Sequence, residues 1–215
     1  MTLAVDLYWS FRSPYSYLAT PRLRALARAY DVDIRVRPVY PLAIRTPDFF
    51  AELDPLWFPY LLTDVLRIAE MEGIPFGAPQ PDPVVQDIAT RKIADDQPYI
   101  RRLTRLGALA AEQGIGLDFL FEVATLIWSG EVVWTEGDHL SAAVARAGGD
   151  LAAMEAEIAR RTDNLEAIID ANQAAQREGG HWGVPLMVFE GEPFFGQDRI
   201  DALIWRMKQK GLAAR

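Results

Sequence analysis

The sequence predicts an α/β protein in which strands lie near both ends of the chain and a long helical segment lies between them. Apolar stretches typical of strands cover residues 3–9, 32–38, 186–189 and 193–195. From about residue 41 to 164 the strand signal disappears and helical patterns follow one another. With 215 residues, of which 50% are hydrophobic, the chain can fill one sizeable core.

A strand, a helix and a second strand open the chain. Residues 3–9 are rich in aliphatic and aromatic side chains and end at a serine-rich turn, which favours a buried strand. Ser13 is expected as the N-cap and Pro14 as the first residue of a helix whose apolar positions recur at helical spacing up to Tyr30. Alternating apolar and charged residues over 32–38 predict a second strand, parallel to the first and joined to it by a right-handed crossover.

Helical segments fill the middle of the chain, and glycines or a linker rich in proline and glycine separate them. They are predicted over residues 57–72, 99–113, 118–129, 138–147, 150–163 and 164–178. We therefore interpret residues 41–164 as a helical insertion domain, and residues 1–40 together with 165–215 as the domain that contains the strands.

Strand character returns after this helical block. Leu186 to Phe189 form a continuous apolar run typical of a central strand, and a turn leads into a short strand over residues 193–195. A final amphipathic helix is expected from Asp198, which would be its N-cap. The resulting order, β-α-β, helices, α-β-β-α, is that of a thioredoxin-like core interrupted by an all-helical insertion.

Composition excludes several classes of function. The chain has no cysteine, so it forms no disulfide, no thiolate metal site and no redox cycle on thiols of its own. A net charge of -8 and a pI of about 4.8 argue against a nucleic-acid partner. His139 and His181 show no metal-ligand spacing, and no metal is expected. The N-terminus lacks the features of a signal peptide and no apolar run suits a membrane span, so we expect a cytoplasmic protein without a membrane partner.

Ser13-Pro14-Tyr15-Ser16 stands where thiol-disulfide enzymes of the thioredoxin type carry C-x-x-C, between the first strand and the first helix. Two longer stretches, VDLYWSFRSPYSYLA near the start and GVPLMVFEGEPFFGQDRIDAL near the end, resemble the 2-hydroxychromene-2-carboxylate isomerase family. This family is related to kappa-class glutathione transferases and to the bacterial oxidoreductase DsbA. The order and spacing of the two stretches fit the family across nearly the whole chain.

The resemblance implies that the missing sulfur is supplied by glutathione. In the family, the serine at the position of Ser13 contacts the glutathione sulfur, so Ser13 is expected to donate a hydrogen bond to a thiolate. The residues themselves give Ser13 a second role as helix N-cap, and the two roles are compatible because a helix N-terminus stabilises an anion. Neither histidine is placed by the sequence next to Ser13, so a Ser-His triad has little support.

The rest of the glutathione site is also implied by the resemblance. A cis peptide bond is expected between Val184 and Pro185, with the Val184 backbone directed at the cysteinyl part of the tripeptide. The turn before the last helix is expected to hold the γ-glutamyl end, and it consists of Phe195, Gly196, Gln197 and Asp198.

The expected substrate is 2-hydroxychromene-2-carboxylate or a related aromatic conjugated carboxylate, isomerised between cis and trans forms by reversible thiolate addition. Where the family usually has a glycine-rich turn, a lysine and asparagines, this chain has RPVYPLAIRTPDFF, so Arg45 is the candidate for binding the carboxylate. Arg12 and Trp9 are further candidates, although an aromatic side chain more often lies in a core. The alternatives are a kappa-like glutathione transferase and a redox-inactive DsbA-like module that binds peptides or proteins. The resemblance also implies a homodimer.

Overall fold

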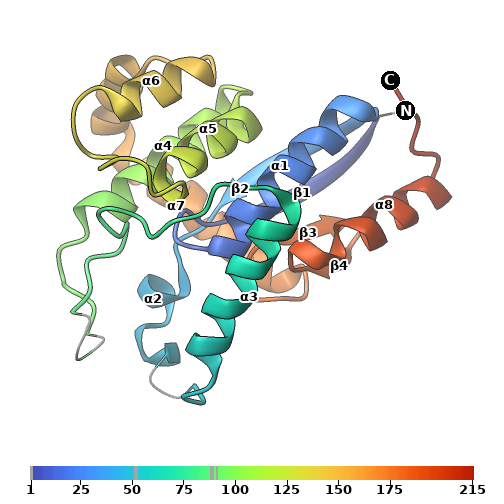
Figure 1. Cartoon of the computed structure of the whole chain (residues 1–215). Helices are drawn as coiled ribbons and strands as arrows, with labels where there is room; N and C mark the ends of the chain where they lie inside the picture. Colours follow the sequence, from blue (N-terminus) through green and yellow to red (C-terminus); the bar gives the residue numbers. More distant parts are fainter. Residues whose placement is uncertain (1, 51–52, 88–89, 91) are drawn as a thin grey trace.

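The computed structural model of the chain describes residues 2–50, 53–87, 90 and 92–215. Its centre is a mixed four-stranded sheet (Figure 1), made of β1 (Leu3–Trp9), β2 (Val32–Pro38), β3 (Leu186–Phe189) and β4 (Glu192–Phe195). The strands lie in the order β2-β1-β3-β4. β1 is parallel to β2 and antiparallel to β3, and β4 is antiparallel to β3. The predicted thioredoxin-like arrangement of strands is therefore confirmed.

Helices from the middle and the ends of the chain pack around this sheet. They are α1 (Pro14–Ala29), α2 (Leu42–Arg45), α3 (Trp57–Glu72), α4 (Pro98–Glu112), α5 (Gly116–Trp128), α6 (His139–Arg146), α7 (Leu151–Glu178) and α8 (Ile200–Gln209), with 3-10 helices η1 (Pro47–Phe50) and η2 (Gln197–Arg199). α8 packs against α1, β3 and β4, whereas α7 packs against β2 and α4. α4, α5 and α6 group at the end of the molecule away from α8 (Figure 1).

The helical segment and the sheet share one hydrophobic core. The ring of Phe11, just after β1, meets that of Phe119 on α5 edge to face, with centroids 6.2 Å apart. A Cβ atom added to Gly107 on α4 would lie only 3.0 Å from the Phe11 ring. A larger residue at position 107 would therefore require the Phe11 ring to shift by a few tenths of an ångström. The domain boundaries at residues 41 and 164 stay a prediction.

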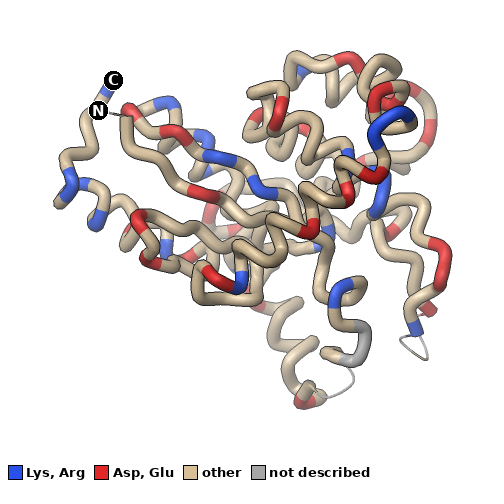
Figure 2. The backbone as a smooth tube through the Cα atoms, turned by 180° about the vertical axis from the view of Figure 1, so that it is seen from behind, with Lys and Arg blue, Asp and Glu red and all other residues tan. Residues whose placement is uncertain are grey.

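Both ends of the chain lie side by side (Figures 1 and 2). The Leu3 N–H donates to the Asp31 carbonyl, and the Asp31 N–H donates to the Ala213 carbonyl at 2.8 Å. The Arg215 N–H reaches the Ala29 carbonyl at 3.0 Å. These contacts hold both ends of the chain where β1 begins, at the opposite end of this strand from the start of α1.

Acidic and basic residues are interspersed along the backbone (Figure 2), and many are joined in ion pairs. Among the described residues, no helix combines the length and the apolar character that crossing a bilayer requires.

The predicted break between the segments 150–163 and 164–178 is present within α7, where the non-helical backbone of Arg161 (φ −123°, ψ 23°) separates two helical stretches close to the predicted boundary. One prediction about a helix is wrong. The last helix starts at Ile200 and not at Asp198, which lies in η2 and caps no helix with its side chain. The Asp198 carboxylate instead pairs with Arg199 at 2.7 Å, and this neighbouring cation takes the place of the helix amides as its partner.

Candidate active site

Ser13 joins the start of α1 to the loop before β3. Its extended backbone (φ −100°, ψ 113°) and the proline at the next position start the helix, as predicted. The Ser13 Oγ accepts the Ser16 N–H at 3.2 Å and donates to the Val184 carbonyl at 3.4 Å, across 171 residues of sequence. The hydroxyl therefore lies between a helix N-terminus and the Val184 backbone.

The loop before β3 has the predicted cis peptide bond between Val184 and Pro185. Its carbonyls are occupied, because Gly183 O accepts from Gln176 at 2.7 Å and Val184 O accepts from Ser13. The Val184 N–H, in contrast, has no acceptor among the described residues. This leaves one backbone donor next to the Ser13 hydroxyl and available to a ligand.

The turn after β4 lies against both of these segments. The Gly196 N–H donates to the Pro185 carbonyl at 2.9 Å, and Arg22 of α1 donates to the Gln197 carbonyl at 3.3 Å. Gly196 has a positive φ of 102°, and a Cβ atom there would lie 2.5 Å from the Asp198 carboxylate. The structure therefore brings together all the residues predicted for the glutathione site, although the Asp198 carboxylate already pairs with Arg199.

Tyr15 of the Ser13-Pro14-Tyr15-Ser16 motif connects the start of α1 to α3. Its hydroxyl donates to the Asp64 carboxylate at 2.8 Å. Burial, followed by this bond and the charge of Asp64, raises the pKa of Tyr15, and the charge of Asp198 adds to the effect. Tyr15 is therefore a neutral donor at physiological pH.

Arg45 is a cation without an acidic partner among the described residues. Its guanidinium donates to the Tyr40 carbonyl at 2.6 Å, the Gln176 side chain at 3.0 Å and the Trp182 carbonyl at 3.1 Å. Burial, and secondarily the charge of Arg177, lowers the pKa of Arg45 to about 10. A desolvated cation surrounded by neutral acceptors is destabilised, and a bound carboxylate would supply the missing counter-charge.

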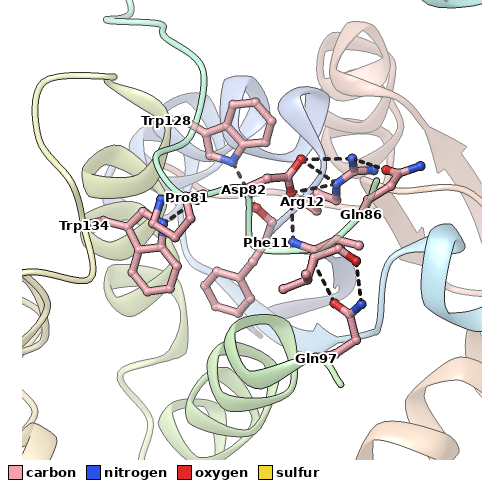
Figure 3. Close-up of polar contacts among 10 residues, drawn as sticks. Phe11, Arg12, Pro81, Asp82, Gln86, Gln97, Trp128 and Trp134 are labelled. Carbon is pink, nitrogen blue, oxygen red and sulfur yellow. Dashed lines mark hydrogen bonds and ion pairs between the residues drawn. The ribbon is translucent and has the colours of Figure 1, made fainter. Parts of the chain in front are cut away.

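Arg12, the other predicted carboxylate ligand, is paired within the protein (Figure 3). Its Nε and Nη2 donate to the Asp82 carboxylate at 2.9 and 3.0 Å, and Nη2 also donates to Gln86 at 3.0 Å. Asp82 and Gln86 belong to the segment between α3 and α4, which we call the strap. Trp134 also holds this strap, because its indole donates to the Pro81 carbonyl at 2.8 Å. Arg12 therefore fastens this strap beside α1, and its charge is neutralised there.

The prediction that Trp9 lines a substrate site is wrong. Trp9 is fully buried, and its indole donates to the Ser16 carbonyl at 2.9 Å and the Thr20 hydroxyl at 3.0 Å. Its ring packs edge to face on Phe11, with centroids 4.7 Å apart. Because β1 is a central strand, its side chains are covered on both faces, and Trp9 points beneath α1 and not into solvent.

A group of aromatic rings lies around the loop before β3. Trp182 packs on Phe49 with centroids 4.8 Å apart, Phe49 on Phe50 at 5.3 Å, and Phe50 on Trp57 at 5.7 Å. Trp182 is 43% exposed and adjoins Arg45 through its carbonyl. We call these four residues the aromatic wall. The pair Phe49-Phe50, at the end of the segment that departs from the family pattern, was the sequence signal for it.

Comparison with known proteins places this geometry in a family. The model of the DSBA-like thioredoxin domain matches residues 4–208, and the chain belongs to that family. Within this class it is 27% identical to 2-hydroxychromene-2-carboxylate isomerase of Pseudomonas sp. (strain C18), over 93% of this chain and 88% of the relative. It is 25% identical to the enzyme of the same name from Pseudomonas putida, over 92% of this chain and 91% of the relative. The predicted resemblance is confirmed.

Solved structures show the same fold. The structure of a 2-hydroxychromene-2-carboxylate isomerase covers 96% of this chain and 95% of its own, with a TM-score of 0.72 and 24% identity. The cytosolic disulfide reductase DsbM from Pseudomonas aeruginosa with GSH covers 96% of this chain and 100% of its own, with a TM-score of 0.59 and 19% identity.

Proposed function

We propose that this protein is a glutathione-dependent isomerase that interconverts cis and trans forms of 2-hydroxychromene-2-carboxylate or a related aromatic conjugated carboxylate. The observation that carries the proposal is the juxtaposition of Ser13, at a helix N-terminus, with the unpaired N–H of Val184 in a chain without cysteine. The names of the two curated relatives support the isomerase chemistry.

The residues present fit glutathione. The Val184 N–H and carbonyl can pair with the cysteinyl backbone as a short strand does, and the turn at residues 195–198 lies beside them to receive the γ-glutamyl end. Ser13 would turn its hydroxyl proton from the Val184 carbonyl to the ligand sulfur while still accepting the Ser16 N–H. That bond and the helix N-terminus both favour the ionised thiol.

When bound, glutathione would supply the thiolate that adds reversibly to the conjugated double bond and so permits rotation. The protein's own residues orient the substrate. Arg45 would bind its carboxylate, because it is the predicted cation whose charge no described acid neutralises. The aromatic wall would pack against its ring, since an exposed indole edge next to a cation suits a planar anion.

The test is an absorbance assay of the isomerisation with and without glutathione. We expect a rate that depends on glutathione, with substrate and product interconverting and no thiol consumed. Equal rates in both conditions would reject the cofactor role. A stable glutathione conjugate detected by mass spectrometry would favour the kappa-like transferase instead. Peptide binding in calorimetry with no glutathione affinity would favour the redox-inactive DsbA-like module.

We expect this isomerase to be a cytoplasmic homodimer. α3 and the residue before it expose several large apolar side chains, which a second subunit would cover. They are Leu56, Phe58, Tyr60, Leu62, Leu66 and Met71, between 43 and 76% exposed. Light scattering coupled to size exclusion measures the mass, and 24.1 kDa for the particle would contradict the dimer.

A further inference from the structure

The peptide group between Trp182 and Gly183 is held from both sides by side chains. The Gly183 N–H donates to His181 Nδ1 at 2.9 Å, and the Trp182 carbonyl accepts from Arg45 at 3.1 Å. A neutral imidazole can accept at Nδ1 only when its proton is on Nε2, so this bond also fixes the tautomer of His181.

The next two peptide groups are held as well. The Gly183 carbonyl accepts from Gln176 of α7, and the Val184 carbonyl accepts from Ser13 of α1. Because the C=O and N–H of a trans peptide point in opposite directions, the Gln176 contact turns the Val184 N–H away from α7. The direction of the unpaired Val184 N–H is therefore constrained by the Gln176 contact and, one peptide group earlier, by the His181 contact.

The His181 ring is itself fixed by packing. It stacks on Phe195, with centroids 3.8 Å apart and planes inclined by 20°, and on Trp182 at 5.1 Å. The two rings leave no space for a side chain at Gly183, since a Cβ atom there would lie 2.5 Å from the Phe195 ring and 3.1 Å from His181. A stacked, hydrogen-bonded imidazole defines the shape of the loop more closely than the loop backbone could alone.

We propose that His181 is a positioning residue that locks the loop at residues 182–185 in the shape that presents the Val184 N–H to a thiol ligand, and that protonation of His181 opens this lock. The inference rests on the proposed glutathione site, which it deepens by assigning a regulator to it. Arg45, Gln176 and Ser13 do not change charge near neutral pH, so His181 is the member of this set that can respond.

Protonation reverses the hydrogen-bonding character of Nδ1. The neutral ring accepts the Gly183 N–H, whereas the imidazolium would place a second donor against it. Burial lowers the pKa of His181 below its ordinary value of about 6.5, so the ring is neutral and the lock closed at pH 7. Affinity for the ligand should therefore fall as the pH drops through this lowered pKa.

Charged groups on the elements around the loop do not account for the shift. They are Arg45 on α2, Arg177 and Glu178 on α7, Glu192 on β4, paired with Arg206, and Asp198 and Arg199, which pair with each other. The cause of the lowered His181 pKa is burial and not any of these charges.

Calorimetric titration between pH 5 and 7.5 tests the lock, with S-methylglutathione as the probe because it has no ionisable thiol. For the unchanged protein we expect affinity to fall by about 3- to 10-fold toward pH 5, the effect of one hydrogen bond. His181→Phe keeps a stacking ring without an acceptor and should bind with the lower affinity at every pH. His181→Asn keeps an acceptor that does not titrate and should give a flat profile at the higher affinity.

His139→Asn is the matched control, because His139 lies at the start of α6 and is the only other histidine in the chain. Its pH profile should match that of the unchanged protein. Identical profiles for the unchanged protein and His181→Phe would overturn the inference, and so would an acid-side loss in His181→Asn as large as in the unchanged protein.

A measurement without ligand separates this inference from the proposed function. Amide hydrogen exchange of Gly183, followed by NMR, should speed up by about tenfold in His181→Phe and in the unchanged protein at pH 5, after correction for intrinsic rates. If Gly183 behaves so but no glutathione compound binds at any pH, the proposed function fails and the lock stands. If Gly183 exchange is the same in His181→Phe, the lock is wrong whatever binds.

Discussion

Arg12 and Arg45 were both predicted to bind the substrate carboxylate, and they differ in what surrounds them. Arg12 forms a bidentate ion pair with the Asp82 carboxylate and so fixes the strap beside α1 (Figure 3). Arg45 meets only carbonyl and amide oxygens, under an exposed aromatic wall. The comparison indicates that an arginine can bind an anionic ligand when the protein gives its guanidinium neutral acceptors, as at Arg45, and not a carboxylate, as at Arg12. Arg12 therefore contributes to holding the fold together, whereas Arg45 keeps an uncompensated charge that the proposed carboxylate substrate would neutralise.

Replacement of Arg45 should have the largest effect. Arg45→Met keeps most of the apolar stem and removes the charge, and loss of a buried charge partner costs about 2 to 4 kcal/mol, or about 30- to 1,000-fold in kcat/KM. The loss should appear mainly in KM for the carboxylate substrate. Arg45→Lys, which keeps a charge without the planar fork, should lose about tenfold.

The same variant distinguishes charge from structure. Glutathione affinity of Arg45→Met should fall by no more than about tenfold, because the direct bond to the Trp182 carbonyl is lost while the bond from Gln176 to the Gly183 carbonyl can remain. An equal loss for the substrate and its methyl ester would show that Arg45 does not bind the carboxylate.

Ser13→Ala should give the next largest effect, on the thiol side of the site. The rate should fall by about 10- to 100-fold, at or below the loss for one oxyanion-hole donor, with kcat changed more than KM. Because Ser13 is also an N-cap, the free energy of unfolding should fall by about 1 kcal/mol. Ser16→Ala is the control, since Ser16 is fully buried and offers only its backbone N–H to Ser13. A Ser13→Ala enzyme at full rate would contradict the role of Ser13.

A feature of this site could be predicted from the sequence when the residues that form it are close together in the chain. The N-cap at Ser13 and the strand after Pro185 depend on neighbours in sequence, and both were predicted. The cis bond at Val184 followed from the family resemblance. The pairing of Arg12 with Asp82 joins residues 70 positions apart, so the pattern of charges alone left Arg12 and Arg45 equivalent.

Orientation was the second thing that sequence could not supply. Trp9 is the last residue of β1 and Trp182 lies in the loop before β3, yet Trp9 is fully buried and Trp182 is 43% exposed. Which face of a strand or loop meets solvent is decided by the helices that pack on it, and that is a tertiary property. The stack of Trp182 on Phe49 likewise joins distant segments of the chain.

Removal of the Trp182 ring should have a smaller effect than loss of Ser13. Trp182→Ala leaves the carbonyl that binds Arg45 and removes a partly exposed ring, which is worth about 0.5 to 1.5 kcal/mol, or about 2- to 13-fold in KM for the substrate. Trp205→Ala is a matched control, because Trp205 is 56% exposed on α8, where the Arg206 guanidinium lies over its ring. If both variants raise KM alike, the aromatic wall has no special role.

The smallest effect on activity is expected from replacement of Arg12, which is paired with Asp82. Arg12→Met should change KM for the carboxylate substrate by less than about threefold, because Asp82 already neutralises this charge in the free protein. The cost should appear as stability, about 1 kcal/mol or less, since Asp82 is 46% exposed and solvent screens the pair. Asp82→Asn provides the converse measurement: it frees the Arg12 charge, and a second cation beside the site should tighten substrate binding if the fold permits a carboxylate there. A large KM increase in Arg12→Met, with no increase in Arg45→Met, would show that Arg12 and not Arg45 binds the substrate carboxylate.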